Sequence, residues 1–164
     1  MMNKATIDLI KKDPKVDGVY FYIINDLMPD SVLDIGMLLK RNGSVTRSAG
    51  GLSISWQMIL DGVDVMPDLK AGVYSVIYNH ITSLDDFISE VCSGHFEKRY
   101  DLIVAFDLCD FIDDKQAEII IPSLLNNSES LLLDSSSFQK YTPYLASSHF
   151  KKIPYEEATS YLIY

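Results

Sequence analysis

Basic residues, cysteines and long apolar runs are all scarce in this chain. Its 164 residues hold 14 Lys and Arg against 23 Asp and Glu, which gives a formal net charge of −9. Such an acidic balance disfavours broad electrostatic binding to nucleic-acid phosphates or to anionic lipid. The two cysteines, Cys92 and Cys109, form no CxxC or zinc-ligand pattern. We therefore expect neither a disulfide framework nor a metal site.

Signals that would direct the chain to a membrane are also missing from the sequence. No stretch approaches the roughly 18 consecutive apolar residues of a membrane span. The segment Met1–Asp13 has lysines but lacks the apolar core of a signal peptide. We therefore expect a soluble, reduced, cytoplasmic protein. The length predicts a single domain over residues 1–164, with residues 1–30 as an N-terminal helical segment packed on it.

Short apolar runs alternate with helical patterns along the chain. Apolar runs bounded by turn residues predict strands at 31–36, 63–67, 74–81, 100–106 and 130–134, and a terminal pair at 150–154 and 160–164. Helices are predicted at 6–12, 20–27, 84–91 and 115–125, while 54–60 fits either a helix or a strand. Ser83 is the expected N-cap of the third helix and Asp113 or Asp114 of the fourth, which Pro122 should end or kink. This alternation predicts a three-layer, doubly wound α/β fold with a mostly parallel sheet of about seven strands.

Polar residues and a glycine lie near the predicted ends of the central strands. In open α/β sheets, ligands bind in the crevice beyond the carboxyl ends of the strands. A carboxylate there accepts hydrogen bonds from a ribose diol or a ligand amine, and a glycine lets a ligand approach the backbone. The residues expected at this edge are Asp34, Gly36, Asp64, Asn79, His80, Asp107 and Asp110.

Several of these segments resemble the motifs of one enzyme family. Val32-Leu33-Asp34-Ile35-Gly36 resembles the first motif of the class I S-adenosylmethionine-dependent methyltransferases. Gly62-Val63-Asp64-Val65-Met66-Pro67 is similar to their second motif, whose acidic residue holds the ribose hydroxyls. The run from Tyr100 to Asp107, followed by Leu108–Ile112, resembles the fourth-strand motif, and Ser130–Ser135 fits the fifth strand. The resemblance spans about residues 20–164 and implies a class I methyltransferase-like Rossmann fold.

The resemblance also implies a cofactor, a reaction and a set of site residues. The implied cofactor is S-adenosylmethionine, and the implied function is methyl transfer to a small-molecule or protein substrate. Nucleic acid and membrane partners are not expected, and a homo-oligomer is left open. Asp107 and His80 are the candidates for a catalytic role, His80 because the unperturbed pKa of histidine lies near ~6.5. The residues implied to contact the cofactor are Asp34, Gly36, Asp64, Val65, Asn79 and Asp107.

The chain departs from the family pattern in its glycine loop. Leu38 stands at the last glycine position of the loop, where its side chain would point toward the methionine part of the cofactor or force the loop to move. The interval from Asp34 to Asp64 also exceeds the about 20 positions between the corresponding elements of a dinucleotide fold, so 41–51 is a candidate insertion. These departures favour an alternative, a catalytically inactive methyltransferase-like binding or assembly module. A different nucleotide-binding protein is a third reading, but no GxGxxG or GxxxxGK[ST] pattern supports it.

Each candidate residue also has an ordinary structural explanation. Asp34 and Asp64 would serve equally as helix caps or as strand ends facing water, and Gly36 as part of a tight turn. Asn79 suits turn chemistry, and His80 suits an exposed position on the surface. A basic cluster, formed by Lys40, Arg41 and Arg47, would either bind an anionic group or lie in a solvated loop.

Overall fold

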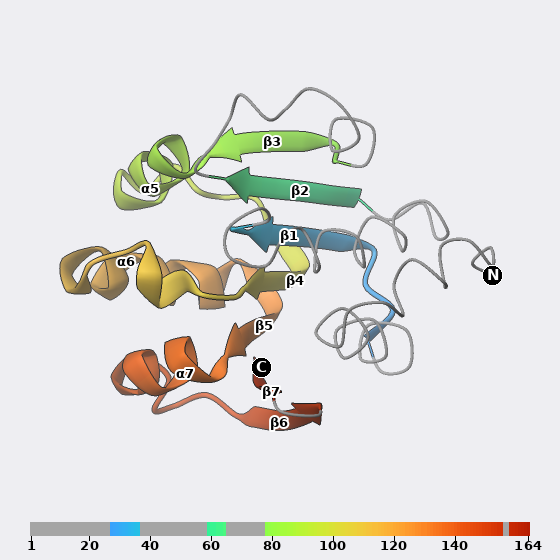
Figure 1. Ribbon diagram of the computed structural model, residues 1–164. Helices are drawn as coiled ribbons and strands as arrows, with labels where there is room; N and C mark the ends of the chain where they lie inside the picture. The colour runs from blue at the N-terminus through green and yellow to red at the C-terminus, as the bar shows by residue number, and fades with distance from the viewer. Residues whose placement is uncertain (1–26, 37–58, 65–77, 156–157) are drawn as a thin grey trace.

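The computed structural model describes residues 27–36, 59–64, 78–155 and 158–164. In these residues seven strands form one sheet in the order β3-β2-β1-β4-β5-β7-β6 (Figure 1). The strands are β1 (Ser31–Ile35), β2 (Ile59–Asp64), β3 (His80–Ser83), β4 (Tyr100–Ala105), β5 (Ser128–Asp134), β6 (Phe150–Tyr155) and β7 (Ala158–Ile163). The fold is therefore the mostly parallel α/β sheet that the sequence predicts.

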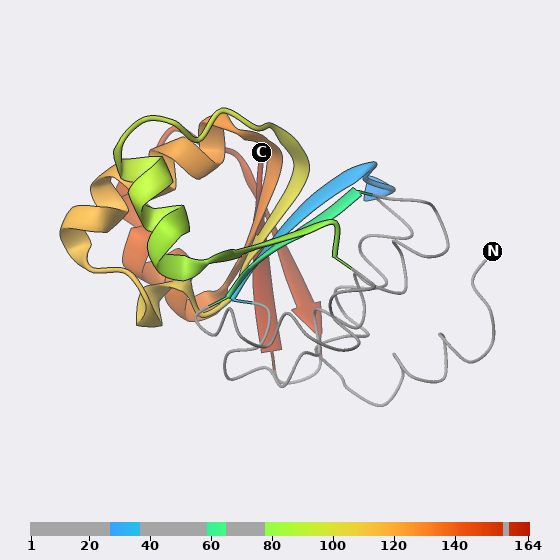
Figure 2. The ribbon, with the colours of Figure 1, turned by 90° about the horizontal axis from the view of Figure 1, so that it is seen from above.

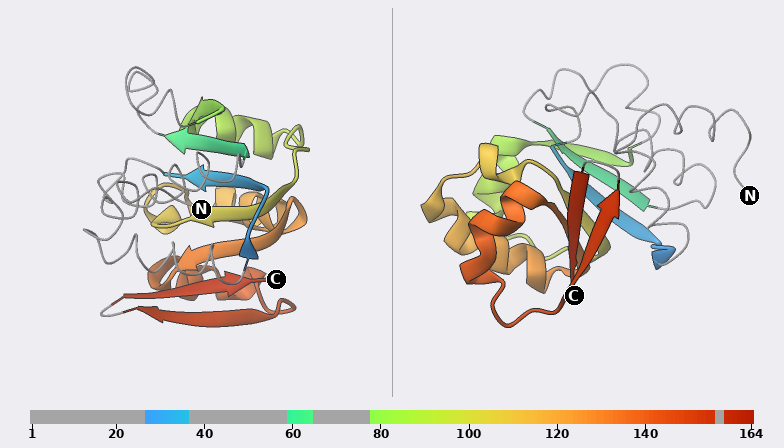
Figure 3. Two further views of the ribbon diagram at one scale, coloured as in Figure 1. Left: turned by 90° about the vertical axis from the view of Figure 1, so that its right-hand side faces the viewer. Right: turned by 60° about the horizontal axis from the view of Figure 1, so that its bottom comes forward.

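The first five strands run parallel, and the last two reverse direction. β1 pairs in parallel with β2 on one side and with β4 on the other. β7 runs antiparallel to both β5 and β6. Figure 3 shows β6 and β7 side by side at one edge of the sheet, which confirms the predicted terminal pair.

Three α-helices in the described part of the chain cover one face of the sheet. They are α5 (Leu84–Cys92), α6 (Asp114–Asn126) and α7 (Ser135–Tyr141), accompanied by the short turns η3 (Leu108–Asp110) and η4 (Thr142–Tyr144). Figure 2 shows these helices together on the same side. None of the helices in this part of the chain has the length and apolar character needed to cross a bilayer.

The main core lies between these helices and the sheet. Leu33 and Ile35 of β1 belong to the same buried cluster as Phe87 of α5 and Ile120 and Leu124 of α6. Each buried aliphatic or aromatic side chain of this kind contributes about 1.5–3 kcal/mol relative to exposure. Because side chains alternate along a strand, Asp34, which lies between Leu33 and Ile35, points to the opposite face of the sheet. The Asp64 side chain at the end of β2 points to that same face.

Local signals in the sequence explain how the helices begin. The Ser83 side chain accepts a hydrogen bond from the backbone N–H of Asp86 at 3.1 Å, which confirms it as the N-cap of α5. Asp113, rather than Asp114, caps α6 in a reciprocal capping box with Gln116. Both caps satisfy backbone N–H groups that have no partner inside the helix.

The bounds of three elements differ from those expected, and β2 is the first, since it begins at Ile59 rather than at residue 63. Pro122 does not end α6, which continues to Asn126, because Ile121 and Leu124 on either side are buried in the core. The third strand begins at His80 rather than near residue 74, and it extends to Ser83. The predicted helix at 6–12, all but the last residue of the one at 20–27, and most of the N-terminal segment 1–30 lie outside the described residues.

Candidate functional site

The carboxyl ends of β1, β2 and β4 meet at one edge of the sheet. The chain passes from β1 outward through β2 to β3, and then returns to place β4 on the other side of β1. The strand order therefore reverses between β1 and β4. In doubly wound sheets this reversal opens the crevice that binds ligands.

Gly36 and Asp64 are neighbours at this edge. The backbone N–H of Gly36 donates to the carbonyl oxygen of Val63 at 2.7 Å, directly beside Asp64. Gly36 has a φ of 77°, a left-handed conformation in which glycine alone carries no steric penalty. Asp64 is the last residue of β2 and is 1% exposed. Two motifs that are distant in sequence are thus brought together here.

Asp34 lies one step further inside β1. It pairs with Gly62 of β2, which has no side chain to place beside it. The Tyr78 hydroxyl donates to Asp34 Oδ2 at 2.8 Å, and both side chains are buried. This contact gives the Asp34 carboxylate a fixed orientation on the face opposite α5, α6 and α7. The sequence pattern did not single out Tyr78, since 44 positions separate it from Asp34.

Asp107 follows β4 at the same edge of the sheet. It adopts φ 57° and ψ 20°, a left-handed conformation that is uncommon for a residue other than glycine. Its backbone N–H donates to Asp134 Oδ1, at the end of β5, at 2.8 Å. The candidate residues Asp34, Gly36, Asp64 and Asp107 therefore lie on, or shortly after, β1 and the two strands that pair with it, β2 and β4.

Asn79 and His80 lie at the opposite edge, which corrects the expectation that they flank the same crevice. His80 is the first residue of β3 and pairs with Asp61 of β2. The Asn79 side chain accepts a hydrogen bond from the backbone N–H of Leu60 at 3.0 Å, and the Asn79 backbone N–H donates to the Leu60 carbonyl. Since β3 is parallel to β2, these contacts fix both residues at the amino end of the sheet.

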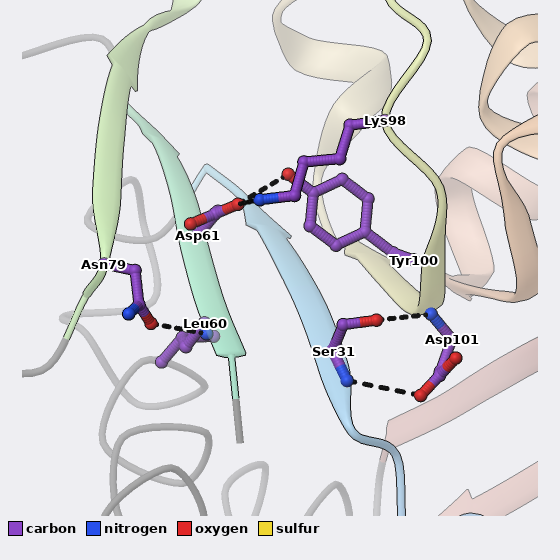
Figure 4. A network of polar contacts seen from close by, with 7 residues as sticks. All are labelled: Ser31, Leu60, Asp61, Asn79, Lys98, Tyr100 and Asp101. Atoms are coloured by element: carbon purple, nitrogen blue, oxygen red, sulfur yellow. Dashed lines mark hydrogen bonds and ion pairs between the residues drawn. The ribbon is translucent and has the colours of Figure 1, made fainter. Parts of the chain in front are cut away.

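The amino edge carries a polar network of its own (Figure 4). The buried Asp61 carboxylate accepts hydrogen bonds through Oδ2 from Lys98 Nζ at 2.5 Å and from the Tyr100 hydroxyl at 2.7 Å. Figure 4 shows the other oxygen of Asp61 on the side of β3. Burial, and then the hydrogen bond to Asp61, raise the pKa of Tyr100 well above the ordinary tyrosine value. The phenol therefore stays neutral and serves as a donor.

A second pair of contacts closes the amino ends of β1 and β4. Asp101 Oδ2 accepts from the backbone N–H of Asp30 at 2.7 Å, and the Ser31 hydroxyl accepts from the Asp101 backbone N–H at 3.0 Å. These contacts tie the first residues of β1 to β4.

The remaining candidates give no further site within the described residues. Val65, Leu38 and the basic cluster of Lys40, Arg41 and Arg47 lie outside those residues. In the described part of the chain, no group of three or more His, Cys, Asp or Glu side chains is arranged to hold a metal ion.

Solved structures match this arrangement along nearly the whole chain. The Thermoplasma acidophilum protein 1320 is 16% identical with a TM-score of 0.61, and the match covers 96% of each chain. The 16S rRNA methylase ArmA is 13% identical with a TM-score of 0.59, over 96% of this chain and 89% of that one. Fibrillarin from Aeropyrum pernix, with natively bound S-adenosyl-L-methionine, is 14% identical with a TM-score of 0.58, over 92% and 74%.

The chain has the fold of the class I S-adenosylmethionine-dependent methyltransferases. This confirms the fold that the motif order implies. No protein-family model matches the chain, and no curated protein matches it in sequence. At these low identities the structural likeness establishes the fold alone.

Proposed function

We propose that this protein binds S-adenosylmethionine at the carboxyl edge and transfers its methyl group to a small-molecule or protein substrate. The observation that carries the proposal is the pairing of Gly36 with Val63, which sets a left-handed glycine beside the strand-end carboxylate of Asp64. Both residues adjoin the reversal of strand order between β1 and β4. Ligand binding at that point is the general rule for doubly wound sheets.

The residues at this edge fit the chemistry of the cofactor. Asp64 is the candidate to accept hydrogen bonds from the two ribose hydroxyls, and Gly36 allows the ligand to approach the backbone closely. The carboxylates suit a cofactor that is itself cationic at its sulfonium and ammonium groups. When bound, the cofactor supplies an activated methyl group, so the chain has mainly to position a nucleophile in line with it.

Asp107 is the candidate both to flank the bound cofactor from the side of β4 and to act on the substrate. It lies just after β4, which is next to β1 in the sheet, and its backbone N–H is bonded to Asp134. A carboxylate at this place would orient the attacking group or take its proton. His80 has no part in this proposal, because it lies at the amino edge.

The solved structures add support from outside the chain. ArmA is an rRNA methylase, and the Aeropyrum pernix fibrillarin was found with S-adenosyl-L-methionine bound. Two features in the sequence, Leu38 and the long interval between Asp34 and Asp64, keep the inactive module as the alternative.

Isothermal calorimetry with S-adenosylmethionine and S-adenosylhomocysteine distinguishes the proposed function from the inactive module. The proposal predicts saturable binding of both compounds, with adenosine binding more weakly than either. Absence of heat at millimolar cofactor would contradict the proposal and favour the module. Methyl transfer to a substrate library would then distinguish an active enzyme from a protein that only binds the cofactor.

A further inference from the structure

The turn after β4 is held from the end of β5. Asp107 is in the left-handed region, where a residue with a Cβ is disfavoured. Its backbone N–H donates to Asp134 Oδ1 at 2.8 Å, so the carboxylate of a neighbouring strand stabilises this conformation. Hydrogen bonds to a charged acceptor are stronger than those between neutral groups.

The same carboxylate is also the N-cap of α7. Asp134 Oδ2 accepts from the backbone N–H of Ser137 at 3.3 Å. The Ser137 hydroxyl in turn accepts from the backbone N–H of Cys109 at 3.2 Å, and Ser137 is fully buried. One aspartate thus uses its two oxygens for two tasks, and the first turn of α7 is tied to the turn at Asp107–Cys109.

We propose that Asp134 is a positioning residue for the cofactor site. Asp134 acts through the backbone of Asp107. It stabilises the turn that places the Asp107 side chain at the carboxyl edge of the sheet. This inference rests on the proposed function, since it assigns Asp107 to the site that binds S-adenosylmethionine.

A matched pair of substitutions separates the two tasks of Asp134. In Asp134→Ser one hydroxyl remains, which suffices to cap α7 but not to hold Asp107 as well. Asp113→Ser is the control, because Asp113 caps α6 through the backbone N–H of Gln116 at 2.8 Å and makes the same change of charge. Since serine is a good N-cap, both variants are expected to fold.

Two measurements compare the effects of these substitutions on the cofactor site and on the turn at Asp107. Calorimetry gives the affinity for S-adenosylhomocysteine, and NMR gives the shift and the hydrogen-exchange rate of the Asp107 amide. We expect Asp134→Ser to weaken binding about tenfold, the factor that corresponds to one hydrogen bond to a charged group, and to speed exchange of that amide. Asp113→Ser should change the affinity by less than about twofold and leave the Asp107 amide unaltered.

The outcomes distinguish this inference from the proposed function. If the unsubstituted protein binds no S-adenosylhomocysteine, the proposed function fails and the positioning role fails with it. If the unsubstituted protein binds but the two variants have equal affinities, the proposed function stands and the inference is overturned. If the Asp107 amide changes while affinity does not, Asp134 is a structural residue only, which also overturns the inference.

Discussion

The two edges of the central sheet use carboxylates in different ways, and β2 contains one of each kind. Asp61, near the start of the strand, bonds with Lys98 and Tyr100 on the face that carries the helices. Asp64, at the end of the same strand, lies on the other face beside the backbone of Gly36. The two aspartates therefore differ in their position along the same strand and not in residue type. Asp61, near the start, stabilises the fold, and Asp64, at the end, is placed to bind a ligand.

The largest contrast is expected in cofactor affinity. Asp64→Asn removes the charged acceptor for the ribose hydroxyls, so we expect the affinity for S-adenosylhomocysteine to fall at least about tenfold. Asn79→Ala removes an acceptor at the amino edge and should change this affinity by less than about twofold. Calorimetry on both variants checks the contrast. Equal losses of affinity would remove the functional distinction between the edges.

The next effect concerns stability at the amino edge. Asp61→Ala leaves the Tyr100 hydroxyl without its acceptor in a buried position, and we expect the free energy of unfolding to fall by about 2–3 kcal/mol. Tyr100→Phe, which leaves Lys98 on the carboxylate, should cost about 1 kcal/mol. Urea denaturation measures both losses. Cofactor affinity should stay unchanged under conditions where each variant is folded, and a specific loss of binding would assign Asp61 to the site.

The smallest effect is a dependence on alkaline pH. The pKa of Tyr100 is raised in the folded protein, so its contribution to stability is complete below pH about 10 and is lost as the pH rises further. Above pH about 10, the free energy of unfolding should fall more steeply with pH in the unsubstituted protein than in Tyr100→Phe. Urea denaturation across this range gives both slopes, and parallel curves would show that Tyr100 ionises alike in both states.

Local patterns predicted much of the fold. The apolar runs at 31–36 and 100–106 and the cap at Ser83 depend on neighbours in sequence, and β1, β4 and α5 confirm them. Of the two effects expected of Pro122, an end of the helix does not occur, because burial of Ile121 and Leu124 outweighs the hydrogen bond that a proline cannot donate.

The site was predictable only in part, because contacts between distant residues decide the rest. The pairing of β1 with β2 brings Gly36 to Asp64, as the motif order implies. Asn79 was assigned to the wrong edge because the register of β3 against β2 sets where β3 begins, and no local pattern reveals that register. The contact between Asp107 and Asp134 was also not predicted. An aspartate followed by serines at a strand end is a usual N-cap signal, and it would have pointed to Asp134.

A crystal structure grown with S-adenosylhomocysteine tests the central claim most directly. We expect the ribose hydroxyls within hydrogen-bond distance of the Asp64 carboxylate, with the ligand passing over Gly36 between β1 and β4. A ligand bound at the amino edge beside Asp61 and Asn79, or one with its ribose turned away from Asp64, would contradict it.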